Sequence, residues 1–164
     1  QGVSAVPKER FRLFWDNIPI WFKLREHATL FASHGACITS AVYPYNWCNT
    51  FAGLDTSKPL ESLAEGVVLP YLNRGIGYRI DFISGLVEDY SLDGLVLQSS
   101  RTCKPFLIGQ YDIATGVERK AGVPSVLIEG DMVDSRFYDE ARVNAQIESF
   151  MELLAARAPG RKGK

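Results

Sequence analysis

Cys103 stands where a strand is expected to give way to a helix. The apolar run Leu95–Gln98 and two serines precede it, and Lys104-Pro105, a pair typical of the first turn of a helix, follows it. Free backbone N–H groups and the positive end of the dipole at a helix start stabilise a thiolate, and Arg101 and Lys104 add positive charge. Such a thiolate could attack an electrophile or bind a soft metal, and a partly buried, inert thiol is the third interpretation.

A nucleophilic cysteine needs a base, and the sequence offers few. The two histidines are His27 and His34, which fall inside and at the end of an expected helix. Neither is expected at the carboxyl ends of the strands, where Cys103 is placed. This weakens the interpretation of Cys103 as the nucleophile of a cysteine-dependent hydrolase.

The other two cysteines, Cys37 and Cys48, form no metal-binding pattern. The chain has 3 cysteines and no C-x-x-C pair, so no complete metal site is visible in the sequence. Cys37 lies early in an apolar run and is expected to be a small core residue, whereas Cys48 lies among aromatic residues and could be a second ligand. An odd number of cysteines without disulfide spacing favours reduced thiols and a cytoplasmic location.

Three carboxylates, Glu129, Asp131 and Asp134, crowd the end of another expected strand. Carboxylate clusters of this kind can hold a hard cation. The interpretation we favour needs no metal. Asp134 is expected to cap backbone N–H groups at the start of the last helix, and Arg136 is expected to pair with a neighbouring carboxylate.

Apolar runs alternate with segments of helical periodicity along the chain. Four runs rich in β-branched or aromatic residues predict strands, at 11–15, 36–43, 95–100 and 124–129, and the second is expected to be buried on both faces. Helices are predicted at about 21–34, from 57 onward, and at 78–90, 104–120 and 137–156, with a long ordered loop at 44–56. Strands that alternate with helices form a parallel sheet. The sequence therefore predicts a doubly wound, Rossmann-like α/β domain with roughly four parallel strands flanked by helices.

Length and charge exclude several classes of protein. The 164 residues are 46% hydrophobic, which suits a single α/β domain at 1–156 followed by a basic tail at 157–164. A formal net charge of -1 gives no general attraction to nucleic acid. No apolar stretch approaches the roughly 20 residues of a membrane helix. The first residues, QGVSAVPKER, contain no apolar signal core.

The turn at Cys103 belongs to a longer pattern. Residues 99–112 read SSRTCKPFLIGQYD, followed by GVP at 122–124, IEGDMVDSR at 128–136 and IESF at 147–150. With RLFW at 12–15, IPIW at 18–21 and residues 36–47, this combination resembles the carboxyl-terminal part of the 2-hydroxyacyl-CoA dehydratase and benzoyl-CoA reductase family (the 2-hydroxyglutaryl-CoA dehydratase D-component). The block around Cys103 is most similar to the β-type dehydratase subunit, which has an N-R-S-C-K-P-Y-S-x-G-Q-Y-D-like segment.

The resemblance implies a component of an oxygen-sensitive radical enzyme. Subunits of this family hold a 4Fe-4S cluster through three cysteines, the last of which matches Cys103. Ser99, Ser100, Arg101 and Lys104 are then expected to donate hydrogen bonds to the cluster or its sulfurs. The β-type cluster is implied to relay an electron that an ATP-hydrolysing iron-sulfur activator supplies, and in the dehydratases this electron makes a ketyl radical that expels the hydroxyl group. The implied partners are that activator and a second subunit, which binds most of the acyl-CoA.

The sequence supplies one of the three expected cluster ligands. The other two family cysteines lie in an amino-terminal half that has no counterpart here, and Cys37 and Cys48 do not occupy the ligand motifs. The interpretation we favour is that the chain is the carboxyl-terminal part of a larger subunit and is not active alone. The alternatives are a partner chain that supplies the missing ligands, or a cofactor-free interaction or scaffold domain that has lost the cluster. Dehydration of a 2-hydroxyacyl-CoA and ring reduction of an aryl-CoA both remain open.

Overall fold

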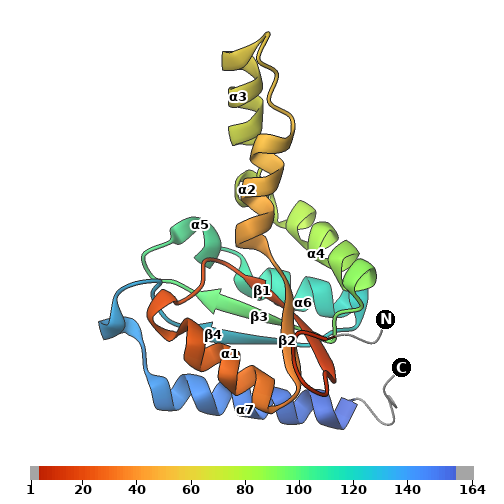
Figure 1. The fold of residues 1–164 in the computed structure, drawn as a ribbon, viewed down its shortest axis with the longest axis vertical. Coiled ribbons are helices and arrows are strands. Elements are labelled where there is room, and N and C mark those ends of the chain that lie inside the picture. The colour runs from red at the N-terminus through yellow and green to blue at the C-terminus, as the bar shows by residue number, and fades with distance from the viewer. Residues whose placement is uncertain (1–3, 158–164) are drawn as a thin grey trace.

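A computed structural model describes residues 4–157 of the chain (Figure 1). The strands are β1 (Phe11–Asp16), β2 (Ala36–Ala41), β3 (Gly94–Ser99) and β4 (Ser125–Glu129), all parallel, in the order β2-β1-β3-β4. The helices are α1 (Leu24–Ser33), α2 (Val42–Ala52), α3 (Pro59–Val68), α4 (Ile76–Tyr90), α5 (Lys104–Leu107), α6 (Gln110–Ala121) and α7 (Glu140–Arg157). Short 3-10 helices are η1 (Trp21–Lys23), η2 (Tyr71–Asn73) and η3 (Ser135–Phe137).

Helices cover both faces of the sheet, because successive side chains of a strand point to opposite faces. Side chains such as Leu13 and Val96 pack against α1 and α7 on one face. On the other face, Phe14, Leu95 and Leu97 pack against α4 and α6. The predicted doubly wound α/β fold with four parallel strands is confirmed.

The second strand differs from its prediction. We expected residues 36–43 to be buried on both faces, but β2 ends at Ala41, and Ala36 is its one buried residue. β2 is an edge strand with a neighbour on one side only, which leaves Cys37 partly buried rather than in the core. Val42 lengthens the apolar run in the sequence but already belongs to α2.

Residues 42–52 form helix α2, where we expected a loop over 44–56. Pro44 is compatible with this helix because it lies in the first turn, where a backbone N–H has no partner within the helix. α2 and α3 stand away from the sheet as an arm, coloured orange to yellow in Figure 1. α3, which we expected to have Pro59 in its first turn, packs chiefly on α2 and exposes Leu60, Leu63 and Val67 to solvent.

The helix predicted over 104–120 is divided in two. α5 ends at Leu107, Ile108 is extended, and Gly109 has a φ of +83° before α6 begins. A side chain at position 109 would also lie 2.8 Å from Cδ1 of Ile76, so this bend requires glycine. The bend leaves α5 only four residues long.

The carboxyl-terminal helix α7 spans nearly the predicted range. Arg157, which we assigned to a basic tail, is its last residue and pairs with Glu118 at 3.0 Å. The rest of that tail, 158–164, lies outside the described residues, so the boundary between domain and tail stays a prediction. None of the helices between residues 4 and 157 has the length and hydrophobicity that a membrane span requires.

Substitution of two leucines should distinguish a buried position from an exposed one by the loss of stability. Leu97, on the central strand β3, is 0% exposed, whereas Leu60 on α3 is 77% exposed. We expect Leu97→Ala to lower the free energy of unfolding by about 2–5 kcal/mol, because it leaves a cavity between β3 and α6. Leu60→Ala should change it by less than about 0.5 kcal/mol. Urea denaturation measures both values, and equal losses would contradict the assigned fold.

Candidate functional site

The carboxyl ends of β1 and β3 are the expected position of a ligand site. β1 continues into η1 and α1 on one face of the sheet, whereas β3 continues into α5 and α6 on the other. Neighbouring strands whose connections leave toward opposite faces open a crevice beyond their carboxyl ends. The turn between β3 and α5, residues 100–103, borders this crevice, and we call it the Cys103 turn.

Cys103 is the residue that precedes the first turn of α5, and its side chain is partly buried. Its N–H donates to the carbonyl of Ser100 at 3.2 Å, and its carbonyl accepts from the N–H of Leu107 at 3.1 Å. The sulfur packs against the apolar cluster that contains Phe106 and Tyr71. One side of the thiol is therefore backed by the core, and the side chain is still partly exposed.

The helix start at Cys103 provides less electrostatic stabilisation than the sequence suggested. α5 has four residues, so few peptide dipoles add up at its N-terminus. Pro105 has no N–H, which removes one of the donors that the first turn would otherwise offer. We expected one long helix after Cys103, with the dipole of that helix stabilising the thiolate. This expectation is wrong, because the helix is interrupted at Gly109.

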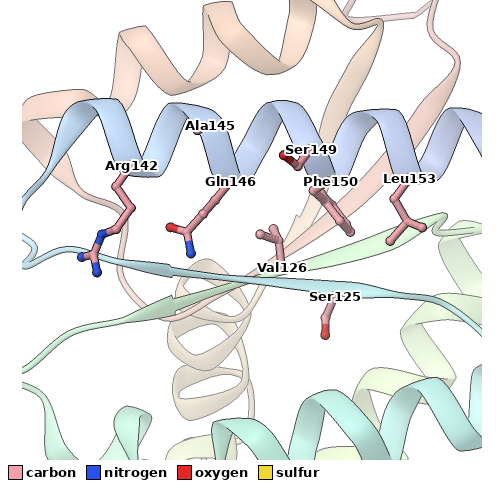
Figure 2. Close-up of a pocket in the computed structure, with 8 residues that line it drawn as sticks. All are labelled: Ser125, Val126, Arg142, Ala145, Gln146, Ser149, Phe150 and Leu153. Atoms are coloured by element: carbon pink, nitrogen blue, oxygen red, sulfur yellow. The ribbon is translucent and has the colours of Figure 1, made fainter.

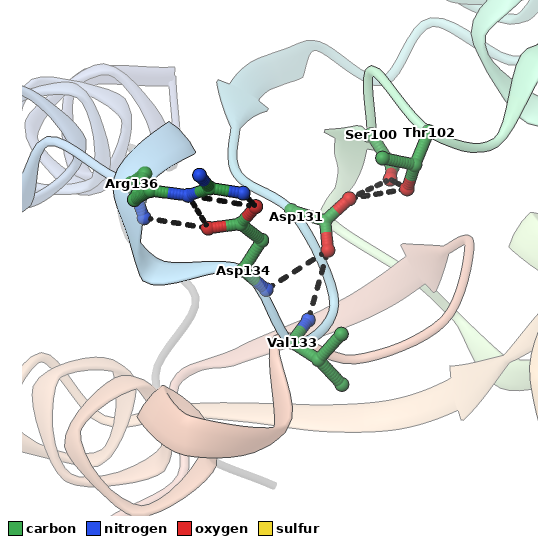
Figure 3. Close-up of polar contacts among 6 residues, drawn as sticks. All are labelled: Ser100, Thr102, Asp131, Val133, Asp134 and Arg136. Carbon is green, nitrogen blue, oxygen red and sulfur yellow. Dashed lines mark hydrogen bonds and ion pairs between the residues drawn. The ribbon is translucent and has the colours of Figure 1, made fainter.

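Asp131 holds the Cys103 turn to the segment that follows β4 (Figure 3). Its Oδ2 accepts hydrogen bonds from the hydroxyls of Ser100, at 3.2 Å, and Thr102. Its Oδ1 accepts from the backbone N–H groups of Val133 and Asp134, both at 3.0 Å. These bonds, that from Thr102 above all, lower the pKa of Asp131 from 3.8 to about 2. The carboxylate is therefore a structural anchor that joins two loops at the carboxyl edge of the sheet.

The other two carboxylates of this edge pair with arginines. Glu129 accepts from Arg101 and, at 2.8 Å, from Arg142. Asp134 caps η3 through the N–H of Arg136 at 3.0 Å and also binds the guanidinium of Arg136, Nη2 to Oδ2, at 2.6 Å (Figure 3). The capping and pairing roles predicted for Asp134 and Arg136 are confirmed, although the capped helix is η3 and not α7. No group of three or more His, Cys, Asp or Glu side chains in residues 4–157 is arranged to hold a metal ion.

The residues expected around a cluster at Cys103 lie in the same turn but have different surroundings. Ser99 and Ser100 are buried, and Ser100 already donates to Asp131. Arg101 pairs with Glu129, while Lys104 is exposed at the start of α5. Hydrogen bonds from these side chains to a cluster stay a prediction.

A second buried polar group, which the sequence did not reveal, lies on the α4 and α6 side of the crevice. Asp16 ends β1 and is 1% exposed, with Tyr71, Arg79 and Gln110 around it. Burial raises the pKa of Asp16 to about 7, and the nearby positive charge of Arg79 opposes that rise. The amide of Gln110 donates to the carbonyl of Gln98 at 2.8 Å, which connects this group to β3.

The histidines lie where the sequence placed them, away from Cys103. His27 is buried on α1, and its Nε2 is 2.8 Å from the hydroxyl of Tyr138. Its ring lies next to Trp15 on the α1 and α7 face of the sheet, whereas Cys103 packs on the opposite face. His34 follows the last residue of α1. No histidine of the described residues is placed to act as a base for Cys103.

An apolar groove of about 460 Å³ lies between β4 and α7 (Figure 2). Its lining includes Val126, Phe150 and Leu153, and Arg142 is its one titratable side chain. Gln146 crosses the groove and donates to the carbonyl of Leu127 at 3.2 Å. The groove lacks the groups that acid-base or nucleophilic chemistry requires, so the Cys103 turn remains the better candidate.

Comparison with known proteins identifies the family. The model of the 2-hydroxyglutaryl-CoA dehydratase D-component family matches residues 1–154. The chain belongs to this family.

Its relatives are subunits of acyl-CoA enzymes. A benzoyl-CoA reductase subunit of Thauera aromatica is 28% identical over 160 residues, covering 93% of this chain and 36% of that protein. Lactoyl-CoA dehydratase subunit alpha of Anaerotignum propionicum is 26% identical over 148 residues, 90% of this chain and 35% of that protein. (R)-2-hydroxyglutaryl-CoA dehydratase subunit alpha of Acidaminococcus fermentans is 26% identical over 165 residues, 100% of this chain and 33% of that protein.

These matches give two facts about the chain. It spans about a third of the length of the curated relatives it matches. The dehydratases among them are alpha subunits, so the likeness of the block around Cys103 to the β-type subunit stays a prediction. The family resemblance predicted from the sequence is confirmed.

Cys103 fits one ligand of a family cluster, and the described residues supply no others. Its thiol is partly exposed and backed by an apolar cluster, and thiolates are the usual ligands of 4Fe-4S clusters. Cys37 lies at the opposite end of the sheet, where it pairs with Arg12 near the start of β1, and Cys48 is exposed on α2. The role of Cys103 as a cluster ligand stays a prediction.

Removal of the Asp131 carboxylate should loosen the Cys103 turn. We expect Asp131→Ala to lower the free energy of unfolding by about 1–3 kcal/mol, because the buried hydroxyl of Ser100 and three partly buried donors lose their acceptor. Asp134→Ala is the matched control. It removes a more exposed pair with Arg136 and should cost less than about 1 kcal/mol.

The pH dependence of the stability difference between the native chain and Asp131→Ala tests whether the carboxylate charge is the cause of the loss. Asp131 has a lowered pKa in the folded chain, so its stabilisation is complete above its ordinary value of 3.8 and is lost as the pH falls toward about 2. The stability gap between the native chain and Asp131→Ala should therefore narrow over this range in urea denaturation. A gap that stays constant would show that the carboxylate charge is not the cause.

Proposed function

We propose that this chain is the part of an acyl-CoA dehydratase or reductase subunit that holds one ligand of a 4Fe-4S cluster and relays an electron. The observation that carries the proposal is the position of Cys103. It lies at the topological switch point of the sheet, in the segment that resembles the last cysteine ligand motif of the family. The reaction is dehydration of a 2-hydroxyacyl-CoA or the related reduction of benzoyl-CoA.

The role of the chain's own residues is to hold the Cys103 sulfur in place. Asp131 fixes one side of the turn through its hydrogen bonds, and Cys103 packs against the apolar cluster that contains Phe106. Backbone N–H groups at the start of α5 and the side chains of Ser99, Arg101 and Lys104 are the donors nearest in sequence for a negatively charged cluster. When bound, the cluster would supply one-electron transfer.

The other parts of the proposed enzyme lie beyond this chain. The two remaining cysteine ligands would come from further sequence of the same subunit or from a partner chain. A second subunit would bind most of the acyl-CoA, and an ATP-dependent iron-sulfur activator would deliver the electron. The chain alone is therefore expected to be inactive.

Iron and sulfide content test the proposal. The protein is prepared without oxygen, both as this chain and as a longer form that extends upstream of Gln1. The longer form is expected to be brown and to lose its iron, sulfide and visible absorption in Cys103→Ser, because a thiolate ligand is removed. Cys37→Ser is the matched control and should keep all three. An unchanged cluster in Cys103→Ser would refute the assignment.

The same preparation separates the cofactor-free scaffold from the electron relay. A scaffold would contain no iron in either form, and its Cys103 would react slowly with iodoacetamide at every pH, as an inert thiol does. Iron in the longer form that depends on Cys103 would exclude the scaffold.

A further inference from the structure

Arg79 is a buried arginine whose hydrogen-bond partners are backbone carbonyls. It is 6% exposed, and its guanidinium donates to Leu72 at 2.7 Å, to Arg74 at 3.2 Å and to Pro105 at 3.1 Å. These carbonyls belong to η2, to the segment before α4, and to α5. One side chain therefore connects three segments, and the last of them is the helix that begins directly after Cys103.

Asp16 is a buried acidic group close enough to interact electrostatically with this arginine, although the two side chains form no direct ion pair. The carboxylate is 1% exposed, and its Oδ1 has no hydrogen-bond partner within the described residues. The centre of the Tyr71 ring lies 5.2 Å from the guanidinium carbon of Arg79, so an aromatic face also packs on the arginine. Buried charges are costly unless they are paired, and an interior arginine without a nearby carboxylate would be unfavourable.

We propose that Arg79, with Asp16 as its counter-charge, is a positioning residue for Cys103. A four-residue helix such as α5 is not stable by itself, so its place depends on contacts with other segments. Asp131 anchors the Cys103 turn from the β4 side, and Arg79 anchors Pro105 from the α4 side. Cys103 lies in the sequence between Thr102 and Pro105, the residues that these two anchors hold.

The inference rests on the proposed function only in treating Cys103 as the functional thiol. Neither Arg79 nor Asp16 is accessible enough to contact a substrate, so both act through the turn. Their effect is measurable on the iron-free chain. Failure of the cluster assignment and failure of this inference are therefore distinguishable.

The test is the alkylation rate of each cysteine with iodoacetamide, followed by mass spectrometry of the cysteine-containing peptides. Cys37, near the start of β2, is the internal reference. Arg79→Met is expected to raise the rate of Cys103 relative to Cys37 by about tenfold, because the turn opens more often without its anchor. In Arg79→Lys the rate of Cys103 relative to Cys37 should lie between the values for the native chain and for Arg79→Met. An ammonium group keeps the charge but cannot donate to all three carbonyls at once.

Ile83→Val is the matched control. Ile83 is 0% exposed on the same helix α4 and belongs to the apolar cluster on which Cys103 packs, so the substitution lowers global stability but removes no hydrogen bond of the Cys103 turn. The ratio of the Cys103 rate to the Cys37 rate should stay unchanged in this variant. An equal rise in Ile83→Val would overturn the proposal, because it would show that loss of stability alone exposes the thiol.

Asp16→Asn provides a second measurement, which decides if circular dichroism shows that Arg79→Met is unfolded. Asparagine keeps the shape of the side chain and removes the charge that balances Arg79. The ratio is expected to rise by about threefold, since the guanidinium loses its counter-charge but keeps its carbonyl partners. An unchanged ratio in folded Arg79→Met, or in Asp16→Asn, would overturn the proposal.

Discussion

The hydrogen bonds between Asp131 and the hydroxyls of Ser100 and Thr102 are the constraint on which the site depends. They join the loops after β3 and β4 at the carboxyl edge of the sheet, where Ser100 and Asp131 are buried and Thr102 is exposed. An ordered turn of this kind has to satisfy its buried polar groups within the protein. The same carboxylate also accepts from two backbone N–H groups after β4, so one side chain ties the Cys103 turn to that segment.

The sheet and most helices were predictable because their patterns are local. Apolar runs marked the strands β1, β3 and β4, and the periodicity of Ile80, Ile83 and Val87 marked α4. The predictions of helices failed where contacts between residues distant in the sequence determine the local structure. The bend at Gly109 has a φ of +83° and brings position 109 close to Ile76, a residue far away in the sequence. Helix α2 contains Pro44 and Asn46, two residue types that are common in loops. Pro44 is compatible with a helix only in the first turn, and the sequence did not show that the helix begins at Val42.

Part of the candidate site was also predictable from the sequence, and part was not. Cys103, Asp131 and Asp134 were found from their places at the ends of strands, since parallel strands bring those ends together. The group around Asp16 was missed because Asp16-Asn17 is typical of a turn, and turns are usually exposed. The partners that keep Asp16 buried, Tyr71 and Arg79, come from η2 and α4. No spacing rule connects them, so only the fold reveals the group.

The surroundings of Cys103 favour a metal ligand over a nucleophile. A nucleophilic cysteine has to be a thiolate before it reacts, and this needs a base or strong positive charge close by. Here α5 is short, Arg101 is neutralised by Glu129, and the described histidines lie elsewhere. A metal ion, in contrast, displaces the thiol proton as it binds and needs mainly a correctly placed sulfur. The structure provides placement, through anchors on both sides of the turn, and little activation.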